Sequence, residues 1–467
     1  MKTKKNIKSY LSIFLLFTAS LISCRKSSFL DVKSNNALTV PTTIADMQAL
    51  LDDDLYMNGS PFNSASGPTP FLGEAGSDNI DINYSDYINA PFIDQNVFIW
   101  GQTVYSTNGI NSWGAPYRTV FYANTALDGL NKIVPSADQK AGYNNVLGSA
   151  LFYRAYGFYQ LAQLFAPVYD SNTAQSDLGI PIRLVADISI PTTRSTVAQS
   201  YNQIIADLQQ SISVLPVIAT TKTRPSKPAA YALLSKVYLA MQDYNDAYLY
   251  ADSCLQLSNN LIDYNQIPAT PSYPFKRMNT ETLFYALLAV EPSYLYGDGI
   301  VDSTLYKSYL SNDLRKSLFF APYAYGGGQQ FRGSYDGSYY YFGGLATDEI
   351  YLIRAECNAR KGNTSSAMND LNTLLQKRFV TGTFVSFTAT DATDALKKIL
   401  VERRKELVMR GVRWTDLRRL NKEPQFAITI SHGVNGKIYT LKPGDPRYVW
   451  PIPYDVIALT GIQQNPR

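Results

Sequence analysis

The sequence contains little histidine and cysteine, and this scarcity excludes several kinds of catalytic and metal site. Its 467 residues include one histidine, His432, and three cysteines, Cys24, Cys254 and Cys357. One histidine cannot form a multi-histidine metal site, and the cysteines lack the paired spacing that binds zinc. A Ser-His-Asp or Cys-His arrangement would have to use His432, which lies in a loop-like stretch. We therefore expect no catalytic residue, metal site or cofactor, and the sequence leaves open only a structural calcium ion in the aspartate-rich loops.

The sequence also lacks a useful surplus of positive charge. Lysine and arginine number 42 against 38 acidic residues, but residues 1–23 contain four lysines and no acid. A chain that begins at residue 24 therefore has 38 charges of each sign. Without an excess of positive charge, a protein has little to neutralise a phosphate backbone. Nucleic acid is excluded as an expected partner.

Long hydrophobic runs are missing too, and the one near the N-terminus is short. Four early lysines precede the uncharged stretch 10–23, which ends in Leu21-Ile22-Ser23-Cys24. This run is shorter than the roughly 20 residues that a membrane-spanning helix needs, and its layout is that of a signal peptide. The last four residues resemble a lipobox. We therefore predict that residues 1–23 are removed and that Cys24 carries a lipid anchor.

Hydrophobic periodicity predicts a mainly α-helical protein. Small and aromatic residues alternate from Ala232 to Leu239 and again at Asp243, Tyr244, Ala247 and Ala251, as in a tetratricopeptide unit. About four helical pairs are expected, in helical repeats at 113–257 and 347–420. Cys254 and Cys357 fall in these repeats, where buried free thiols are favoured over a disulfide. The predicted helices cover residues 42–55, 113–133, 146–165, 197–215, 229–257, 350–359, 367–377 and 394–420.

Two loop-rich insertions, 58–111 and 263–345, interrupt the helical pattern. Both contain glycine, proline and aromatic residues, and the first has a short predicted strand at 97–100. The whole chain has 35 tyrosines. Tyrosine in loops is typical of exported proteins that contact polar ligands, although helix packing would account for most of these side chains. Trp113, Trp414 and Trp450 are assigned to the core.

A charged block lies near the end of the second repeat. Glu402 and Glu406 lie within one or two helical turns of Arg410 and Arg413, so ion pairs within and between helices are expected. Two neighbouring carboxylates could suggest a glycoside hydrolase. The surrounding arginines would keep both carboxylates ionised, whereas a general acid needs a raised pKa. We interpret the block as a structural brace.

Several segments resemble one known family. They are Phe29-Leu30-Asp31, Tyr153 to Phe165 followed by Gly179-Ile180-Pro181, Arg194 to Leu208, the block from Glu402 to Arg419, Trp450-Pro451-Ile452-Pro453 and Gln464-Asn465-Pro466. In this order they resemble the SusD-like (RagB/SusD) outer-membrane nutrient-binding lipoproteins of Bacteroidetes. Arg410, where that family usually has an acid, and Arg25-Lys26, where exported members often have acids, depart from the pattern.

The resemblance implies a single SusD-like domain over 24–467, with 421–467 as its C-terminal segment. It also implies a non-catalytic lipoprotein, anchored in the outer membrane and facing the cell surface. Such a protein captures oligosaccharide and passes it to a TonB-dependent outer-membrane transporter. Two alternatives remain open: a RagB-like protein that captures peptides, and a structural lid or interaction module that binds no glycan.

Sugar rings stack on aromatic faces and their hydroxyls need polar partners, so we look for the binding site in the insertions. The candidates in the first insertion are Asp78, Tyr84 and Trp100. Those in the second are Tyr294, Tyr296 and Tyr323.

Overall fold

The computed structural model describes residues 41–60, 67–105 and 111–467. The predicted signal peptide and the lipidation site Cys24 lie outside these residues. Apart from its first two described residues, the described chain belongs to one compact unit, Thr43–Arg467.

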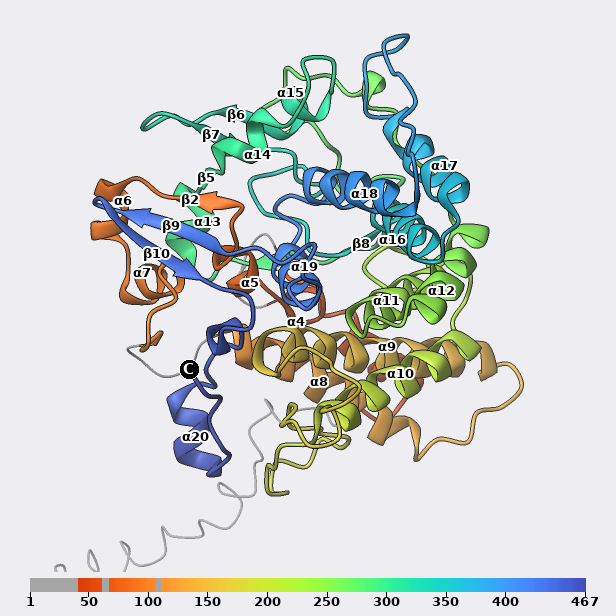
Figure 1. Cartoon of the computed structure of the whole chain (residues 1–467). Helices are drawn as coiled ribbons and strands as arrows, with labels where there is room; N and C mark the ends of the chain where they lie inside the picture. The colour runs from red at the N-terminus through yellow and green to blue at the C-terminus, as the bar shows by residue number, and fades with distance from the viewer. Residues whose placement is uncertain (1–40, 61–66, 106–110) are drawn as a thin grey trace, which may run out of the picture. The chain divides into compact units, whose positions relative to one another are not determined.

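Helices that pack in chain order form the framework of this unit (Figure 1). Helix α9 packs against α8 and α10, α11 against α12, α12 against α16, and α16 against α17 and α18. This succession of neighbours is typical of stacked helical pairs. The main helices are α8 (Asn111–Leu130), α9 (Lys140–Phe165), α10 (Val197–Val214), α11 (Lys227–Ala240), α12 (Tyr244–Leu257), α16 (Thr347–Arg360), α17 (Thr364–Leu375), α18 (Ala392–Glu406) and α19 (Arg413–Leu420).

Local signals in the sequence explain where several helices begin. The Thr43 side chain accepts a hydrogen bond from Asp46 N and caps α3 (Ile44–Leu51), while the Asp46 side chain accepts one from Thr43 N. Thr196 and Gln199 form the same capping box at α10. Such caps satisfy backbone N–H groups that lack partners in the first turn. Thr43 therefore sets the start of α3.

Three predicted helices are divided in the structure. The chain turns between α11 and α12 at Gln242, which has a φ of 61°. Between α18 and α19 it turns at Met409 and Gly411, with φ values of 57° and 73°. The segment 42–55 divides into α3 and α4 (Asp54–Met57). Left-handed backbone ends a helix, and periodicity alone does not reveal it.

The predicted strand at 97–100 is wrong. Residues Phe92–Phe98 form helix α7, and Trp100 follows it with a φ of 53°. Pro91 immediately before the helix and Asp94 in its first turn are ordinary helix-start signals. The apolar run at its end was too short to distinguish a strand from a helix.

Two short strand pairs join the insertions to each other. Strand β1 (Thr69–Pro70) pairs in parallel with β4 (Leu288–Ala289), and β2 (Ile80–Asp81) pairs antiparallel with β5 (Ile300–Val301). Segments about 200 residues apart in sequence therefore lie side by side. The other short elements are α5 (Leu72–Ala75), α6 (Tyr84–Asn89), η2 (Tyr264–Gln266), β3 (Thr282–Phe284), α13 (Ser293–Asp298), α14 (Ser303–Lys307), α15 (Arg315–Phe319), β6 (Phe320–Pro322), β7 (Gln329–Phe331), β8 (Leu345–Ala346), β9 (Ile430–Val434), β10 (Lys437–Leu441), η3 (Pro446–Tyr448) and α20 (Tyr454–Thr460).

The core confirms two further predictions. Trp113, Trp414 and Trp450 are buried in the main hydrophobic cluster. Cys254 and Cys357 are buried and free, without a disulfide. A second cluster of buried apolar residues lies between α16, α17 and α18.

Candidate functional site: a tyrosine-lined cleft

The second insertion forms a cleft of about 620 Å³ with many tyrosines in its walls. We name it the tyrosine cleft. Its walls come from the loop before β3, from α13, from the β6–β7 hairpin and from the segment before β8. Concave sites of this size, with aromatic walls and a few polar groups, are typical of small-molecule binding. The lining residues are Thr270, Ser272, Tyr273, Val290, Ser293, Tyr296, Gly297, Ala321, Gln330, Phe331, Arg332, Tyr339, Tyr340 and Tyr341.

Packed aromatic rings form one part of the cleft wall. Tyr296 and Tyr341 stack with centroids 4.3 Å apart, and Phe71 from the first insertion meets Tyr296 edge-on at 4.9 Å. The Tyr341 hydroxyl donates to the Tyr296 carbonyl at 3.1 Å. Both tyrosines are buried. These contacts fix the two rings, so this wall is preorganised rather than adaptable.

Other rings at the cleft are accessible. Tyr339 is 55% exposed and Tyr273 is 36% exposed, and Tyr340 is half-buried. The rings of Tyr339 and Tyr340 lie 4.0 Å apart between centroids. An exposed tyrosine offers a flat apolar face together with a hydroxyl. Such a surface suits a ligand that is apolar on one face and rich in hydroxyls at its edge.

Polar side chains complete the lining. Gln330 Nε2 donates to Gly297 O at 2.9 Å, and Arg332 donates to backbone carbonyls of residues before Tyr273. Ser272 and Ser293 are exposed. None of the described residues that line the cleft is acidic.

The structure brings one of the six predicted ligand residues, Tyr296, to the wall of the cleft. Tyr294 and Tyr296 are on α13, and only Tyr296 lines the cleft. Tyr323 follows β6, and its hydroxyl lies 3.4 Å from both Asp86 Oδ2 and Asp298 Oδ1. Asp86 is on α6, two residues after Tyr84, which is 47% exposed. Tyr84, Tyr294 and Tyr323 do not line the cleft, and their role in binding stays a prediction.

Trp100 is a packing residue in this structure, contrary to the expectation that it offers a stacking face. It is 1% exposed, its indole donates to Gly76 O at 2.9 Å, and its ring stacks on His432 at 4.5 Å. His432 in turn stacks on Phe98 at 4.1 Å. A ring that is 1% exposed has no face left for a ligand.

Asp78 also has a structural position. Arg413 Nε and Nη2 donate to its two oxygens at 2.7 and 2.8 Å, and Arg404 lies 3.2 Å away. Burial acts to raise the pKa of Asp78, but the two arginines outweigh it and hold the pKa at about 2. The carboxylate is fully engaged and lies outside the tyrosine cleft.

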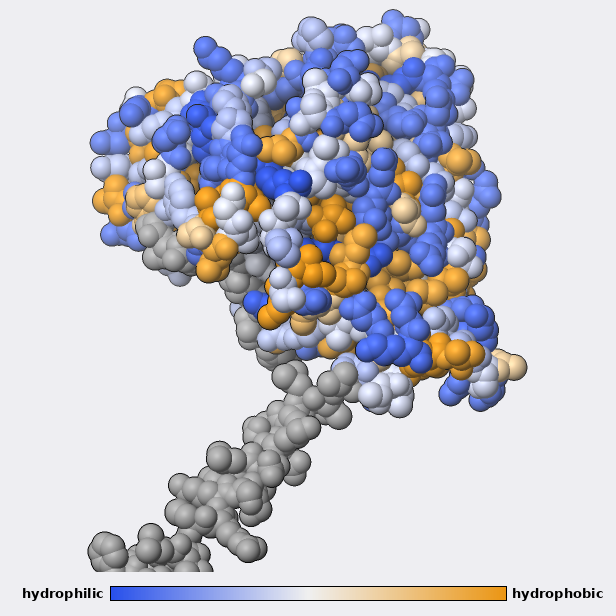
Figure 2. Space-filling view, turned by 90° about the horizontal axis from the view of Figure 1, so that it is seen from below, coloured by the Kyte–Doolittle hydropathy of each residue, from blue (hydrophilic) through white to orange (hydrophobic). Residues whose placement is uncertain are grey.

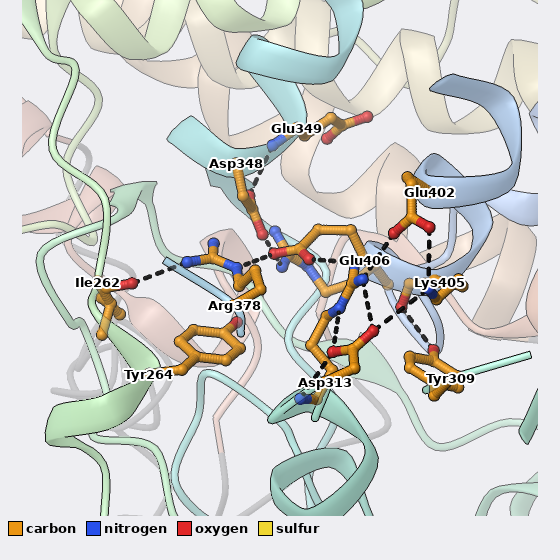
Figure 3. A network of polar contacts seen from close by, with 12 residues as sticks. Ile262, Tyr264, Tyr309, Asp313, Asp348, Glu349, Arg378, Glu402, Lys405 and Glu406 are labelled. Carbon is orange, nitrogen blue, oxygen red and sulfur yellow. Dashed lines mark hydrogen bonds and ion pairs between the residues drawn. The ribbon is translucent and has the colours of Figure 1, made fainter. Parts of the chain in front are cut away.

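The block around Glu402 and Glu406 is a buried ion-pair network, which we name the charged brace (Figure 3). Arg315 donates to Glu402 at 2.6 Å and to Glu406 at 3.0 Å. Arg378 bonds Glu406 at 2.7 Å and Glu281 at 2.8 Å. The predicted structural role is confirmed, since cations surround both carboxylates. The brace joins α18 to the second insertion.

The predicted partners Arg410 and Arg413 are wrong. Arg410 bonds Asp348 at 3.1 Å, with its guanidinium over the rings of Tyr335 and Phe342, and Arg413 bonds Asp78. Helix α18 ends at Glu406, and the turn through Gly411 redirects both arginines.

The one histidine of the sequence is buried in the structure and contacts backbone carbonyls. The His432 nitrogens lie close to the carbonyl oxygens of Phe98 and Ser77, and burial lowers its pKa below the ordinary value. Among the described residues no group of three or more His, Cys, Asp or Glu side chains could hold a metal ion.

A second groove, of about 220 Å³, lies between α8, the loop near Ile188 and α20. Its walls are mainly apolar, with Trp113 and Phe121 among them. Arg183 and Asn124 line it too, but both donate to backbone carbonyls. The second groove therefore offers fewer polar groups for a hydroxyl-rich ligand than the tyrosine cleft.

Seen from below, the surface carries hydrophobic residues in irregular patches between hydrophilic ones (Figure 2).

No helix within 41–60, 67–105 or 111–467 has both the length and the apolar composition needed to cross a membrane.

Comparisons with known proteins agree on one family. Residues 28–239 match a family model described as "Starch-binding associating with outer membrane", and residues 347–467 match the SusD family model. The SusD-like protein P2 of Formosa agariphila is 25% identical over 385 residues, covering 68% of this chain and 73% of that protein.

Solved structures show the same fold. A SusD superfamily protein from Bacteroides thetaiotaomicron has a TM-score of 0.70 at 23% identity, over 91% of this chain and 100% of that one. A SusD-like carbohydrate binding protein from Bacteroides vulgatus has a TM-score of 0.67 at 20% identity, over 90% and 97%.

Proposed function

The chain belongs to the SusD-like family, and from this premise we propose that it is a non-catalytic lipoprotein that captures oligosaccharide in the tyrosine cleft. The observation that carries the proposal is the combination of accessible tyrosine rings with serine, threonine and glutamine side chains around one cleft. Sugar rings have apolar faces that stack on aromatic rings and hydroxyls that bond to polar groups.

The capture role includes an anchor and a partner. We propose that Cys24 is acylated and holds the protein at the outer membrane, facing the cell surface. A TonB-dependent transporter then receives the captured oligosaccharide. The outer-membrane association in the description of the matched family supports this location. Metabolic labelling with a fatty acid, lost in Cys24→Ser, tests the anchor.

The function is tested by affinity gel electrophoresis against plant, host and microbial polysaccharides. The chain from residue 25 contains every described residue and serves as the soluble form. The test variant is Tyr339→Ala, which removes an exposed ring of the cleft. The matched control is Tyr325→Ala, since Tyr325 is 83% exposed in the same insertion but does not line the cleft.

Retardation by a glycan that weakens in Tyr339→Ala and persists in Tyr325→Ala supports glycan capture in the cleft. Binding of peptides but of no polysaccharide would favour the peptide-capturing alternative. Binding of neither, with retained association with a transporter, would favour the structural module. A reducing-sugar assay with the retained glycan should give no release of ends, because the described residues that line the cleft include no pair of carboxyl groups to act as general acid and base.

A further inference from the structure

Arg332 is the one charged side chain among the described residues that line the tyrosine cleft. Its guanidinium makes three hydrogen bonds, all to backbone carbonyls. Nη1 donates to Pro271 O at 3.0 Å, and Nη2 donates to Ala269 O at 2.9 Å and to Ser317 O at 2.6 Å. The Nε–H is buried and has no acceptor. Among the residues that the structure describes, carbonyl dipoles and no carboxylate therefore meet the positive charge of Arg332.

The acids nearest in sequence to the cleft residues are Glu291, Asp298 and Asp336. Glu291 accepts a hydrogen bond from Ser112 N at 3.3 Å and does not line the cleft. Asp336 is bound to Arg277 at 2.7 Å and accepts from the Tyr285 hydroxyl. Asp298 faces the Tyr323 hydroxyl at 3.4 Å, and burial together with the nearby Asp86 raises its pKa. Neither carboxylate lines the cleft. The lining thus has one positive charge and no negative one.

The position of Arg332 also suits contact with a ligand at the cleft. The carbonyls of Ala269 and Pro271 that it binds belong to the loop that carries Ser272 and the exposed ring of Tyr273. The bonds to this loop hold the guanidinium in place before a ligand arrives. One of the two Nη1–H groups has no carbonyl acceptor among these bonds. A fixed cation with a spare donor is a preorganised partner for an anionic oxygen.

We infer that the tyrosine cleft binds a glycan that carries an anionic group, a carboxylate or a sulfate, and that this group pairs with Arg332. The inference rests on the proposed glycan capture and specifies its ligand class. Charge-assisted hydrogen bonds in a partly desolvated cleft contribute enough for about a tenfold preference over the uncharged sugar.

Matched polymer pairs test this inference without relying on any variant. Polygalacturonate is compared with its carboxyl-reduced form, and κ-carrageenan with its desulfated form, by affinity electrophoresis of the chain from residue 25. Tighter binding of one anionic polymer, by about tenfold, is the expected result, and the pair in which it occurs separates carboxylate from sulfate. The preference should fall as NaCl is raised, because salt screens exposed charges.

Two variants then assign the preference to Arg332. Arg332→Met should bring the ratio within a pair close to one, and Arg332→Lys should restore part of it because the charge returns. A preference that survives in Arg332→Met overturns the assignment. Equal or tighter binding of neutral polymers overturns the inference and leaves glycan capture intact. Retention by no polysaccharide at all contradicts the proposed function instead.

Discussion

The charged brace and the tyrosine cleft both involve the second insertion, but they differ in how their polar groups are paired. In the brace, Arg315, Arg378 and Glu406 are fully buried and each bonds an opposite charge. In the cleft, tyrosine rings remain accessible and the one charge lacks a carboxylate partner. Ion pairs that satisfy one another hold a structure together, whereas unused donors and open ring faces suit a ligand. The difference separates the structural region from the binding region.

The largest expected effect is on the stability of the brace. Arg315→Met leaves Asp313, Glu402 and Glu406 without their shared cation. Only Lys405 and Arg378 then remain to balance these carboxylates. Because removing one partner of a buried ion pair costs about 3–5 kcal/mol, we expect a loss near the lower end of that range. Urea unfolding measures the loss. A change below about 1 kcal/mol would show that the brace is not structural.

The matched control for that variant is Lys398→Met. Lys398 pairs with Asp394 at 2.7 Å, but both side chains are about one-third exposed. An exposed pair of this kind contributes little to stability, because water and salt screen it. The free energy of unfolding should therefore hardly change.

Acid should weaken a second set of buried ion pairs, those of Glu349 and Glu356 on α16. Burial alone would raise the pKa values of Glu349 and Glu356, but Lys236 and Arg403 act on the first and Arg419 and Arg360 on the second, and both pKa values fall to about 2. A folded-state pKa below the ordinary 4.5 stabilises the protein above pH 4.5, and this contribution is lost as the pH falls from 4.5 towards 2.

Each of the two glutamates should contribute roughly 2–3 kcal/mol to that loss. Urea unfolding at pH 7, 5, 4 and 3 would follow it. The Glu356→Gln variant is less stable at pH 7, and its stability should depend less steeply on pH. A free energy of unfolding that stays constant from pH 6 to 3 would contradict the assignment.

Substitutions at the cleft should lower glycan affinity and leave the free energy of unfolding almost unchanged. Tyr339→Ala removes a ring that is 55% exposed, so the free energy of unfolding should change by less than about 0.5 kcal/mol. Its glycan affinity should fall about fivefold, which corresponds to roughly 1 kcal/mol of stacking. Isothermal titration calorimetry with the retained oligosaccharide measures the affinity. An unchanged dissociation constant would place the site elsewhere.

The Trp100→Phe variant tests whether Trp100 stabilises the fold or binds the ligand. The smaller ring leaves part of the buried space beside His432 empty and loses the bond to Gly76 O. We expect a loss of about 1–3 kcal/mol in stability and an unchanged glycan affinity. Weaker glycan binding by a folded Trp100→Phe protein would restore Trp100 as a ligand residue.

The sequence predicts the helical framework well, because periodicity and caps act over a few neighbouring residues. The structural role of Glu402 and Glu406 followed from the arginines around them. Their real partner Arg315 could not be found, since it lies about 90 residues away and only the tertiary fold brings it close.

The cleft was predicted in part. Tyr296 was a candidate and lines it, whereas Tyr339, Tyr340 and Arg332 were missed. The run Tyr339-Tyr340-Tyr341 was a visible signal, but composition does not show which of 35 tyrosines remain exposed. The burial of Trp100 was missed for the same reason, because composition does not distinguish a buried aromatic residue from an exposed one in a loop-rich segment.

The most direct test of glycan capture in the tyrosine cleft is a crystal structure of the chain from residue 25 with the oligosaccharide that it retains. If the cleft captures glycan, a sugar ring should stack on Tyr339 or Tyr340 and make polar contacts to the cleft lining. A sugar bound only outside the cleft, for example in the groove beside α20, would contradict it.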